Sequence, residues 1–509
     1  MTNRRLIHLA FSFLLTIVFA CSNCLFTSDS SSSSVSSFTF SASFADDPFP
    51  SPNRKLVQVI VLSRHCDRAP AHSDTGVPND PLDWRLEIGV RAGELTGLGH
   101  SQCYQLGKIL RERYLNARSP FFIHSLSSKP NINKGAVHDV PSVELHHCHR
   151  NGTSRCDPIV RYDAKHFQFH ASDVDRTILS MNSIVQGMFP EGTGPMNDLT
   201  HQFALPHGIT LVPVHAIPNE QDIYLRAIHN CQWIDTHLRL LPRTKVWQSL
   251  NRHWLPFIRE LNDPTGWNLT DIDEFHGAYD IMNCQRSHNR LHVPFALENW
   301  SRIFELASEI QYLRHSRELE DNLGGGPFVE QIRNHMQRMV EYYASQGDER
   351  PAAGATESEE PAVPPPLSYV HYSAHDTTIQ AILAALNMSS QHKALREGPG
   401  YGAQIIWELW LQEGETEATT KKKTVHGWQK MKEQEYFVSF IYRNRYDAAF
   451  ASFQMPKYCN SRAVPHQNDR DHPSHIDDYN HHCPWHHFVR YVNEVSAVPL
   501  DQWCQRCNS

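Results

Sequence analysis

The hydrophobic pattern predicts strand–turn–helix units on both sides of a long helical stretch. Residues 56–63, LVQVIVLS, form an apolar, β-branched run typical of a buried strand. Apolar positions recur at helical spacing over 96–115 and again over 173–189. Residues 367–387, LSYVHYSAHDTTIQAILAALN, repeat the order of strand, polar turn and helix. This alternation is typical of an α/β fold.

The middle of the chain has a different pattern. Residues 219–346 are mostly helical in pattern without strong strand signals, whereas 403–411 and 435–443 resemble a β-hairpin. We therefore expect an α/β fold with a mostly parallel central sheet flanked by helices, interrupted by a smaller all-helical insert or cap domain. The expected parts are a first core part at 53–218, the insert at 219–346, a disordered low-complexity linker at 347–366, and a second core part with a C-terminal disulfide region at 367–509.

The N-terminus resembles a secretory signal. Arg4 and Arg5 precede an apolar stretch that ends at the small residue Ala20, so 1–20 is predicted to be a signal peptide and 21–52 a Ser-rich linker. An uncleaved anchor is the less favoured alternative, because the run is short against the ~20 apolar residues of a membrane helix. We expect a secreted or endolysosomal glycoprotein with no stable membrane span after cleavage. Its predicted glycosylation sites are Asn151, Asn268, Asn299 and Asn387.

Composition narrows the choice of partners. The formal net charge is -8 at pH 7, so no general attraction to nucleic acid or membranes is implied. The 33 histidines would make the molecule much more positive near pH 5, which fits an acidic compartment. We therefore expect no nucleic-acid partner.

Charged side chains gather where the predicted strands end. Arginine forks bind phosphoryl oxygens bidentately, and hydrolysis of a phosphate ester also needs an in-line nucleophile and a general acid. Three segments could converge to supply these groups if their strands lie side by side. The candidates are Arg64, His65 and Arg68 after the first strand, Arg176 at the start of a helix, and His375 and Asp376 after a later strand. These residue types alone do not decide whether His65 or His375 is the nucleophile.

The same segments resemble the histidine acid phosphatase family, in its animal acid-phosphatase branch. RHCDRAP (64–70) is similar to the family's R-H-G-x-R-x-P, DVDRT (173–177) to its central arginine motif, and SAHDTT (373–378) to its His-Asp motif. The resemblance covers most of residues 55–505 in the family's order, and it implies a phosphoglycerate-mutase-like fold.

The resemblance implies an acid phosphatase that hydrolyses phosphate monoesters through a phosphohistidine intermediate. His65 would attack phosphorus and Asp376 would protonate the leaving alcohol. No metal and no cofactor would be required, and a homodimer would be consistent with the family. The phosphoryl oxygens would be held by Arg64, Arg68 and Arg176, helped by His375.

Two alternatives stay open at this point. One is a secretory-pathway phosphatase restricted to a glycan phosphate or an inositol phosphate. The other is a catalytically inactive protein that keeps the phosphate pocket. The second is disfavoured because a protein that only binds phosphate has no need of the general acid.

Cys66 departs from the family pattern, because the family has glycine at this position. A side chain there is expected to cost room or strain beside the pocket. We expect a buried, inert thiol, with an oxidisable thiol among positive residues as the alternative. A cysteine phosphatase is excluded by spacing, because His72 stands where that class needs arginine.

Twelve cysteines suit an oxidising compartment. The segment at 119–160 is an insertion with a plausible local disulfide, Cys148–Cys156. Two His- and Cys-rich segments, ELHHCHRNGTSRC and HHCPWHH, are better explained by disulfides than by zinc. The resemblance further implies the pair Cys459–Cys483, a bond from Cys231 to Cys504 or Cys507, and an unpaired Cys284, since its partner position near Ala403 lacks a cysteine.

Overall fold

The computed structural model describes residues 53–117, 119–123, 146–147, 157–158, 160–346, 365–412, 435–455, 459 and 482–508. Several predictions concern residues outside these ranges. They are the signal peptide, the whole Ser-rich linker, most of the low-complexity linker, the Cys148–Cys156 pair and the glycosylation site at Asn151. None of the described helices is both long and apolar enough to cross a membrane.

A mixed, eight-stranded sheet forms the centre, in the order β10-β8-β7-β1-β6-β4-β5 with β9 beside β8. The strands β1, β6, β4 and β5 pair in parallel, while β7 runs antiparallel between β1 and β8. This confirms the predicted α/β class and the predicted hairpin, which is formed by β7 and β8. The strand bounds are β1 Arg54–Arg64, β4 Phe167–Ser172, β5 Val214–Ile217, β6 Tyr369–Ala374, β7 Gln404–Gln412, β8 Tyr436–Arg443, β9 Ala451–Ser452 and β10 His482–Pro484, with a separate small sheet of β2 His146–His147 and β3 Asp157–Pro158.

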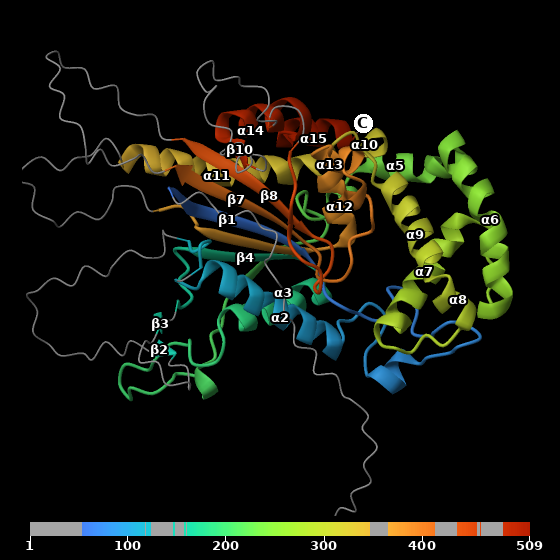
Figure 1. Ribbon diagram of the computed structural model, residues 1–509, viewed down its shortest axis with the longest axis horizontal. Coiled ribbons are helices and arrows are strands. Elements are labelled where there is room, and N and C mark those ends of the chain that lie inside the picture. Colours follow the sequence, from blue (N-terminus) through green and yellow to red (C-terminus); the bar gives the residue numbers. More distant parts are fainter. Residues whose placement is uncertain are drawn as a thin grey trace, which may run out of the picture. The chain divides into compact units, whose positions relative to one another are not determined.

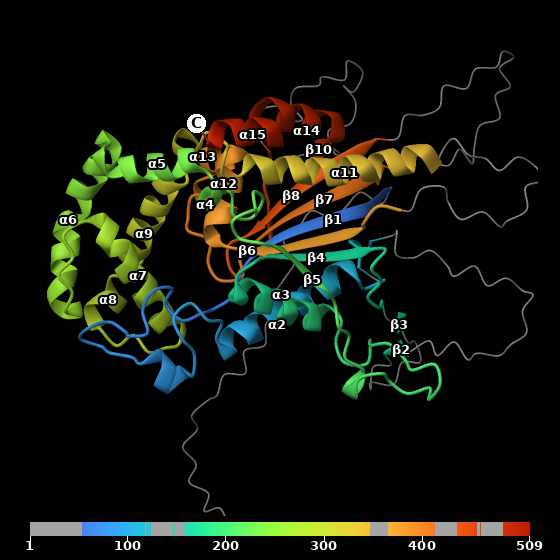
Figure 2. The same cartoon turned by 180° about the vertical axis from the view of Figure 1, so that it is seen from behind.

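Helices cover both faces of this sheet (Figures 1 and 2). The side chains of β1 alternate between two cores: Val59 and Val61 pack with α2 (Gly97–Tyr114) and α3 (Asp175–Met188), whereas Ile60 and Leu62 face the other side. That second face is covered by α11 (Gly326–Gln346), α12 (Asp376–Ala385) and α14 (Trp485–Tyr491). Burial on both faces explains why β1 is continuously apolar.

The helices α2 and α3 lie in direct backbone contact. A Cβ added to Gly107 would fall 2.0 Å from the carbonyl oxygen of Ile184, and one added to Gly187 would fall 2.1 Å from that of Tyr104. Only glycine permits so close an approach at both positions. The two helices therefore form a closely packed pair under the strand that ends in the RHCDRAP motif.

The helices between residues 245 and 314 form a core of their own, which includes Trp254, Phe257, Phe275 and Leu306. Ile228 and Ile234, which precede them, pack instead with Ala381 and Trp503. The long helix α11, by contrast, packs on the central sheet through Phe328. The bounds are α4 Ala227–Asn230, α5 Gln232–Leu240, α6 Lys245–Thr265, α7 Ile272–Ser287, α8 Pro294–Glu298, α9 Trp300–Arg314 and α10 Arg317–Glu320; after β6 come also α13 Met388–Gln391 and α15 Leu500–Cys507.

The disulfides confirm three of the predictions for the cysteines. Cys459 pairs with Cys483, and Cys231 pairs with Cys507 rather than Cys504. Cys284 is buried and unpaired, as expected. Because Cys483 is disulfide-bonded, it is not a thiolate ligand for zinc in the HHCPWHH segment.

Candidate active site

The carboxyl ends of three parallel strands bring the candidate segments together. Arg64 at the end of β1 lies in register with Ala374 at the end of β6, and the His65 amide donates to the Ala374 carbonyl at 2.9 Å. The neighbouring strand β4 ends at Ser172, just before α3. All six predicted site residues therefore lie at the carboxyl ends of these parallel strands, which is the usual position of a ligand site in an α/β fold.

His65 is held in a single neutral tautomer. Its Nδ1–H donates to the carbonyl oxygen of Cys66 at 2.8 Å, and since a carbonyl only accepts, the Nε2 atom keeps a free lone pair. Burial lowers the pKa of His65 well below its usual value, and the charges of Arg176, Arg64 and Arg68 lower it further. An imidazole in this environment stays unprotonated, and therefore nucleophilic, in acid.

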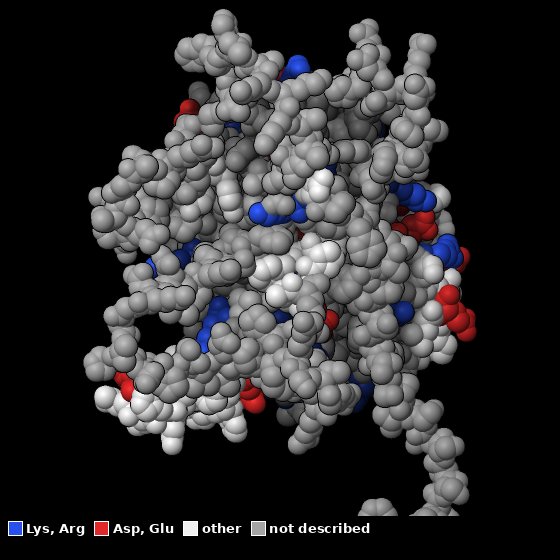
Figure 3. Space-filling model, turned by 60° about the vertical axis from the view of Figure 1, so that its left-hand side comes forward, with Lys and Arg blue, Asp and Glu red and all other residues white. Residues whose placement is uncertain are grey.

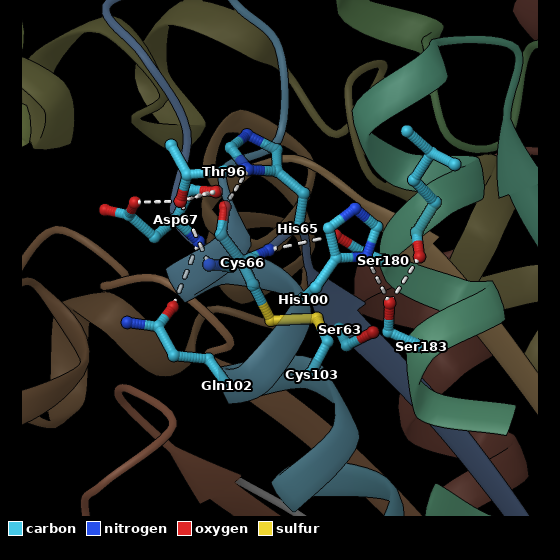
Figure 4. The surroundings of a disulfide bond; sticks show 12 residues. Ser63, His65, Cys66, Asp67, Thr96, His100, Gln102, Cys103, Ser180 and Ser183 are labelled. Carbon is cyan, nitrogen blue, oxygen red and sulfur yellow. Dashed lines mark hydrogen bonds between the residues drawn. A yellow bond between two sulfur atoms is a disulfide. The ribbon is translucent and has the colours of Figure 1, made fainter. Parts of the chain in front are cut away.

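The chain next to His65 differs from the expectation for Cys66. Cys66 is neither an inert nor an oxidisable thiol, because it forms a disulfide with Cys103 on α2 (Figure 4). Its backbone is not among the described residues with positive φ, so replacement of a glycine creates no left-handed strain here. The sequence prediction was wrong because the partner lies on a helix whose approach to this turn the sequence does not show.

Arg64 contacts three groups around the site. Its Nη2 lies 2.9 Å from Oδ2 of Asp376, its Nη1 donates to the Pro399 carbonyl at 2.5 Å, and its guanidinium lies over the Tyr401 ring at 4.6 Å. The ion pair joins the first predicted motif to the last one. Arg64 is thus oriented before any ligand arrives.

Arg68 is oriented by a residue that the sequence analysis missed. Asp280 on α7 accepts from its Nη2 at 2.9 Å and from its Nη1 at 3.2 Å, and it also accepts from the Ala71 amide at 2.8 Å. Burial alone would raise the pKa of Asp280, but the Arg68 guanidinium outweighs it and lowers the pKa, so Asp280 is ionised. The helical stretch therefore supplies a residue that fixes the geometry of the motif.

Arg176 donates to Nδ1 of His375 at 3.4 Å, and Nε2 of His375 lies 2.9 Å from the Ser172 hydroxyl. Thr177 gives its hydroxyl proton to a main-chain carbonyl, so it accepts from Ser172 at 2.9 Å. Ser172 in turn accepts from His375, which places the His375 proton on Nε2. Both ring nitrogens of His375 are thus engaged with protein atoms, and Ser172 and Thr177 are further site residues that sequence reasoning missed.

Asp376 is the first residue of α12, and its Oδ1 accepts from the Thr377 amide at 2.9 Å. Burial would raise the pKa of Asp376, but Arg64, Arg68 and His375 lower it to well below its usual range. The helix N-terminus also favours a negative charge. Without a ligand, Asp376 is therefore a carboxylate.

The site contains more positive than negative charge. Arg64, Arg68 and Arg176 surround His65, whereas Asp376 and Asp280 are the carboxylates that contact them. Within the described part of the chain, the Nε atom of each of these arginines is buried and has no hydrogen-bond partner. Buried charge and unpaired donors are costly unless a ligand compensates them. An anion with several oxygens, such as a phosphoryl group, provides that compensation.

Comparison with known proteins identifies the family of this chain. A family model described as the histidine phosphatase superfamily (branch 2) matches residues 55–132 and 259–442, more than half of the chain. This chain belongs to the histidine phosphatase superfamily, branch 2. The resemblance inferred from the motifs is thereby confirmed.

Individual relatives are distant. Prostatic acid phosphatase of Bos taurus is 24% identical over 468 residues, which span 89% of this chain and 88% of that protein. Human (Homo sapiens) lysosomal acid phosphatase is 22% identical over 465 residues, 90% of this chain and 81% of that protein. The solved phytase structure from Citrobacter braakii aligns at 14% identity and a TM-score of 0.49, covering 89% of this chain and 99% of that one.

As a member of this superfamily, the chain is a phosphoric monoester hydrolase that acts on small-molecule phosphate esters. Its prostatic and lysosomal relatives also confirm the expected location, secreted or in the endolysosomal lumen. A substrate-restricted enzyme or an inactive phosphate-binding protein is not favoured by these relatives. The predicted signal peptide and glycosylation remain predictions.

Proposed function

We propose that this phosphatase uses His65 as its nucleophile, Asp376 as its general acid, and Arg64, Arg68 and Arg176 as its phosphoryl-binding groups, and that it works in acid. The observation that carries the assignment is the fixed tautomer of His65. Its Nδ1 proton is held by the Cys66 carbonyl, so Nε2 is the free nitrogen. His375 lacks such a nitrogen, because Arg176 and Ser172 occupy both of its ring positions.

The proton for the leaving group comes with the substrate in this scheme. A phosphate monoester has a second pKa of ~6, so in acid it arrives as a monoanion that carries one proton. Its negative charge competes with Asp376 for Arg64 and raises the pKa of Asp376. The proton then moves from the phosphoryl oxygen to the Asp376 carboxylate.

Nε2 of His65 attacks phosphorus, and the bond from phosphorus to the ester oxygen breaks. The departing oxygen takes the proton from Asp376, which leaves a phosphohistidine and an Asp376 carboxylate. A water molecule then attacks phosphorus and gives one proton to Asp376 as the bond to Nε2 breaks. Asp376 returns this proton to the phosphate, which leaves as a monoanion, and the Asp376 carboxylate is restored. Positioning and charge stabilisation by the three arginines supply most of the rate acceleration.

His375 has a supporting part in this proposal. With Nδ1 accepting from Arg176, it holds that guanidinium towards the site rather than donating to the phosphoryl group itself. We also propose that the protein needs no metal and no cofactor and does not bind nucleic acid; a homodimer stays an expectation from the family resemblance. The formal net charge of -8 at pH 7 supports the absence of a general attraction to nucleic acid, and along the right-hand edge of Figure 3 acidic and basic side chains lie beside one another.

The proposal is tested by trapping the intermediate. The wild-type protein is mixed with a radiolabelled monoester, quenched in alkali, where phosphohistidine survives, and digested for peptide mapping. Label is expected on the peptide containing His65, and His65→Ala should lose both label and turnover by more than about 1,000-fold. Activity is measured from about pH 4 to 8 with a chelator present. Label on His375, or turnover in His65→Ala, would overturn the assignment.

A further inference from the structure

The disulfide Cys66–Cys103 is located directly beside the nucleophile. It joins the residue after His65 to the middle of α2, with a Cα–Cα distance of 5.9 Å. Both cysteines are fully buried, in the core that β1 shares with α2 and α3. Solvent therefore does not reach the bond in the folded protein, and it is a permanent structural link rather than an exposed redox switch.

Three different contacts hold Cys66 in place (Figure 4). Its side chain is bonded to Cys103 on α2, its amide donates to the Ser180 hydroxyl on α3 at 3.1 Å, and its carbonyl accepts from Nδ1 of His65 at 2.8 Å. The first two contacts hold the side chain and the amide of Cys66, and so the Cα atom that carries this carbonyl group. Since α2 and α3 are in backbone contact through Gly107 and Gly187, both anchors belong to one rigid support.

The next residue is fixed to the same helix. The Asp67 amide donates to Oε1 of Gln102 at 3.0 Å, and Asp67 Oδ2 accepts from the Thr96 hydroxyl at 2.6 Å. A Cβ on Gly99 would fall 2.1 Å from the Asp67 carbonyl oxygen, so this turn lies directly on the first turn of α2. His288, at the end of α7, donates to the same carboxylate at 2.7 Å.

We propose that the Cys66–Cys103 disulfide is a positioning device for the nucleophile, and this inference rests on the proposed role of His65. By fixing the Cys66 carbonyl, the bond sets both the tautomer of His65 and the direction in which Nε2 points. Cys66 and Cys103 are thus positioning residues that do not touch the reacting atoms. Misplacement of a reacting group by about 1 Å can cost roughly 100-fold in rate.

The test must separate positioning from general stability, because loss of a disulfide lowers stability in either case, typically by about 2–4 kcal/mol. The test variant is Cys66→Ala/Cys103→Ala. The matched control is Cys459→Ala/Cys483→Ala, which removes a disulfide on the opposite face of the sheet. Peptide mapping without reductant first establishes the Cys66–Cys103 bond in the wild type; a free Cys66 there would overturn the inference.

The rate of His65 phosphorylation and the steady-state kcat and KM are then measured well below the melting temperatures of all variants. We expect the test variant to lose about 10- to 100-fold in phosphorylation rate and kcat with KM within about threefold, because the arginines that bind phosphate stay in place. The control should lose melting temperature but keep kcat. A kcat within about twofold of wild type in the test variant, an equal loss in the control, or a KM that rises as much as kcat falls would overturn the inference.

A milder variant covers the case in which the double variant does not fold. Ser180→Ala removes the hydroxyl that holds the Cys66 amide and leaves the disulfide intact. It should lower kcat by about 3- to 10-fold with KM unchanged, and no loss of kcat would overturn the inference. Failure of the proposed function would be recognised separately, because the wild type would then form no phosphohistidine.

Discussion

Arg64 and Asp376 form an ion pair across the ends of two neighbouring parallel strands, with Nη2 and Oδ2 2.9 Å apart. One partner belongs to the proposed phosphoryl-binding set and the other is the proposed general acid. In the free enzyme each therefore neutralises the other, and a bound phosphoryl group must share Arg64 with Asp376. This exchange explains how a carboxylate with a lowered pKa can become an acid when substrate is present.

Replacement of Asp376 by Asn should affect esters according to their leaving groups. An alkoxide needs a proton as it departs, whereas nitrophenolate leaves readily without one. We expect kcat for an alkyl phosphate to fall by about 1,000-fold or more and the phosphorylation rate with nitrophenyl phosphate by about 10-fold. Stopped-flow measurement of the nitrophenolate burst gives the phosphorylation rate with nitrophenyl phosphate, and the steady state that follows the burst gives the overall turnover.

The same variant should accumulate phosphohistidine during turnover of nitrophenyl phosphate, because Asp376 also accepts the proton of the attacking water. Equal losses of the phosphorylation rate for both esters would contradict the role of Asp376 as an acid. Asp376→Glu serves as the control that keeps a carboxylate but displaces it.

Arg176→Gln should shift the acid limb of the pH profile upwards. The positive charge of Arg176 disfavours the imidazolium form of His65, and after burial it is the largest cause of the lowered pKa. Removing that charge raises the pKa of His65 towards its usual value. More of the enzyme is then protonated and inactive at acidic pH, so kcat/KM should begin to fall at a higher pH than in the wild type.

Arg176→Lys is the matched control for this shift. It keeps the charge but loses the fork geometry, so kcat/KM should drop while the acid limb stays near its wild-type position. The measurement is kcat/KM for nitrophenyl phosphate across the acidic range. An acid limb that does not move in Arg176→Gln would separate Arg176 from the electrostatics of His65.

Much of the site could be predicted from the sequence because its residues stand at strand ends. Arg64, His65 and Arg68 follow one apolar run, and His375 and Asp376 follow another. Parallel pairing of β1 with β6 then brings them together without further information. The same reasoning could not choose the nucleophile, because that choice depends on which ring nitrogen contacts a protein acceptor.

The residues that support the site were not predictable in this way. Asp280 stands inside a helix, and Cys103 occupies a helical position that resembles any other core residue. Their roles arise from tertiary packing, in which α7 approaches Arg68 and α2 approaches Cys66. A single sequence carries no local signal for such a contact between distant segments. The unexpected cysteine at position 66 was the one clue, and it did not reveal its partner.

Asp280→Ala should weaken both the fold and the site. The carboxylate is partly exposed, at 27% of its side chain, so we expect the free energy of unfolding to fall by about 1–3 kcal/mol rather than by the full cost of a buried ion pair. Arg68 loses the group that orients it, so kcat/KM should fall about 10-fold. Urea titration and steady-state kinetics test both effects, and Asp280→Asn should show a smaller loss of each. Unchanged kcat/KM in Asp280→Ala would show that Arg68 needs no such support.

Glu408→Gln should destabilise the fold and leave the chemistry intact. Glu408 lies on β7 opposite Val59, away from the end of β1 that carries His65, and pairs with the fully buried Arg113 at 2.9 Å. It also accepts from the Tyr114 hydroxyl at 2.6 Å. Removal of its charge leaves the Arg113 guanidinium buried without its carboxylate, which costs about 3–5 kcal/mol. The midpoint of urea unfolding should fall accordingly, while kcat per folded molecule stays at the wild-type value. A loss of kcat in the folded fraction would show that this ion pair also determines the geometry of the active site.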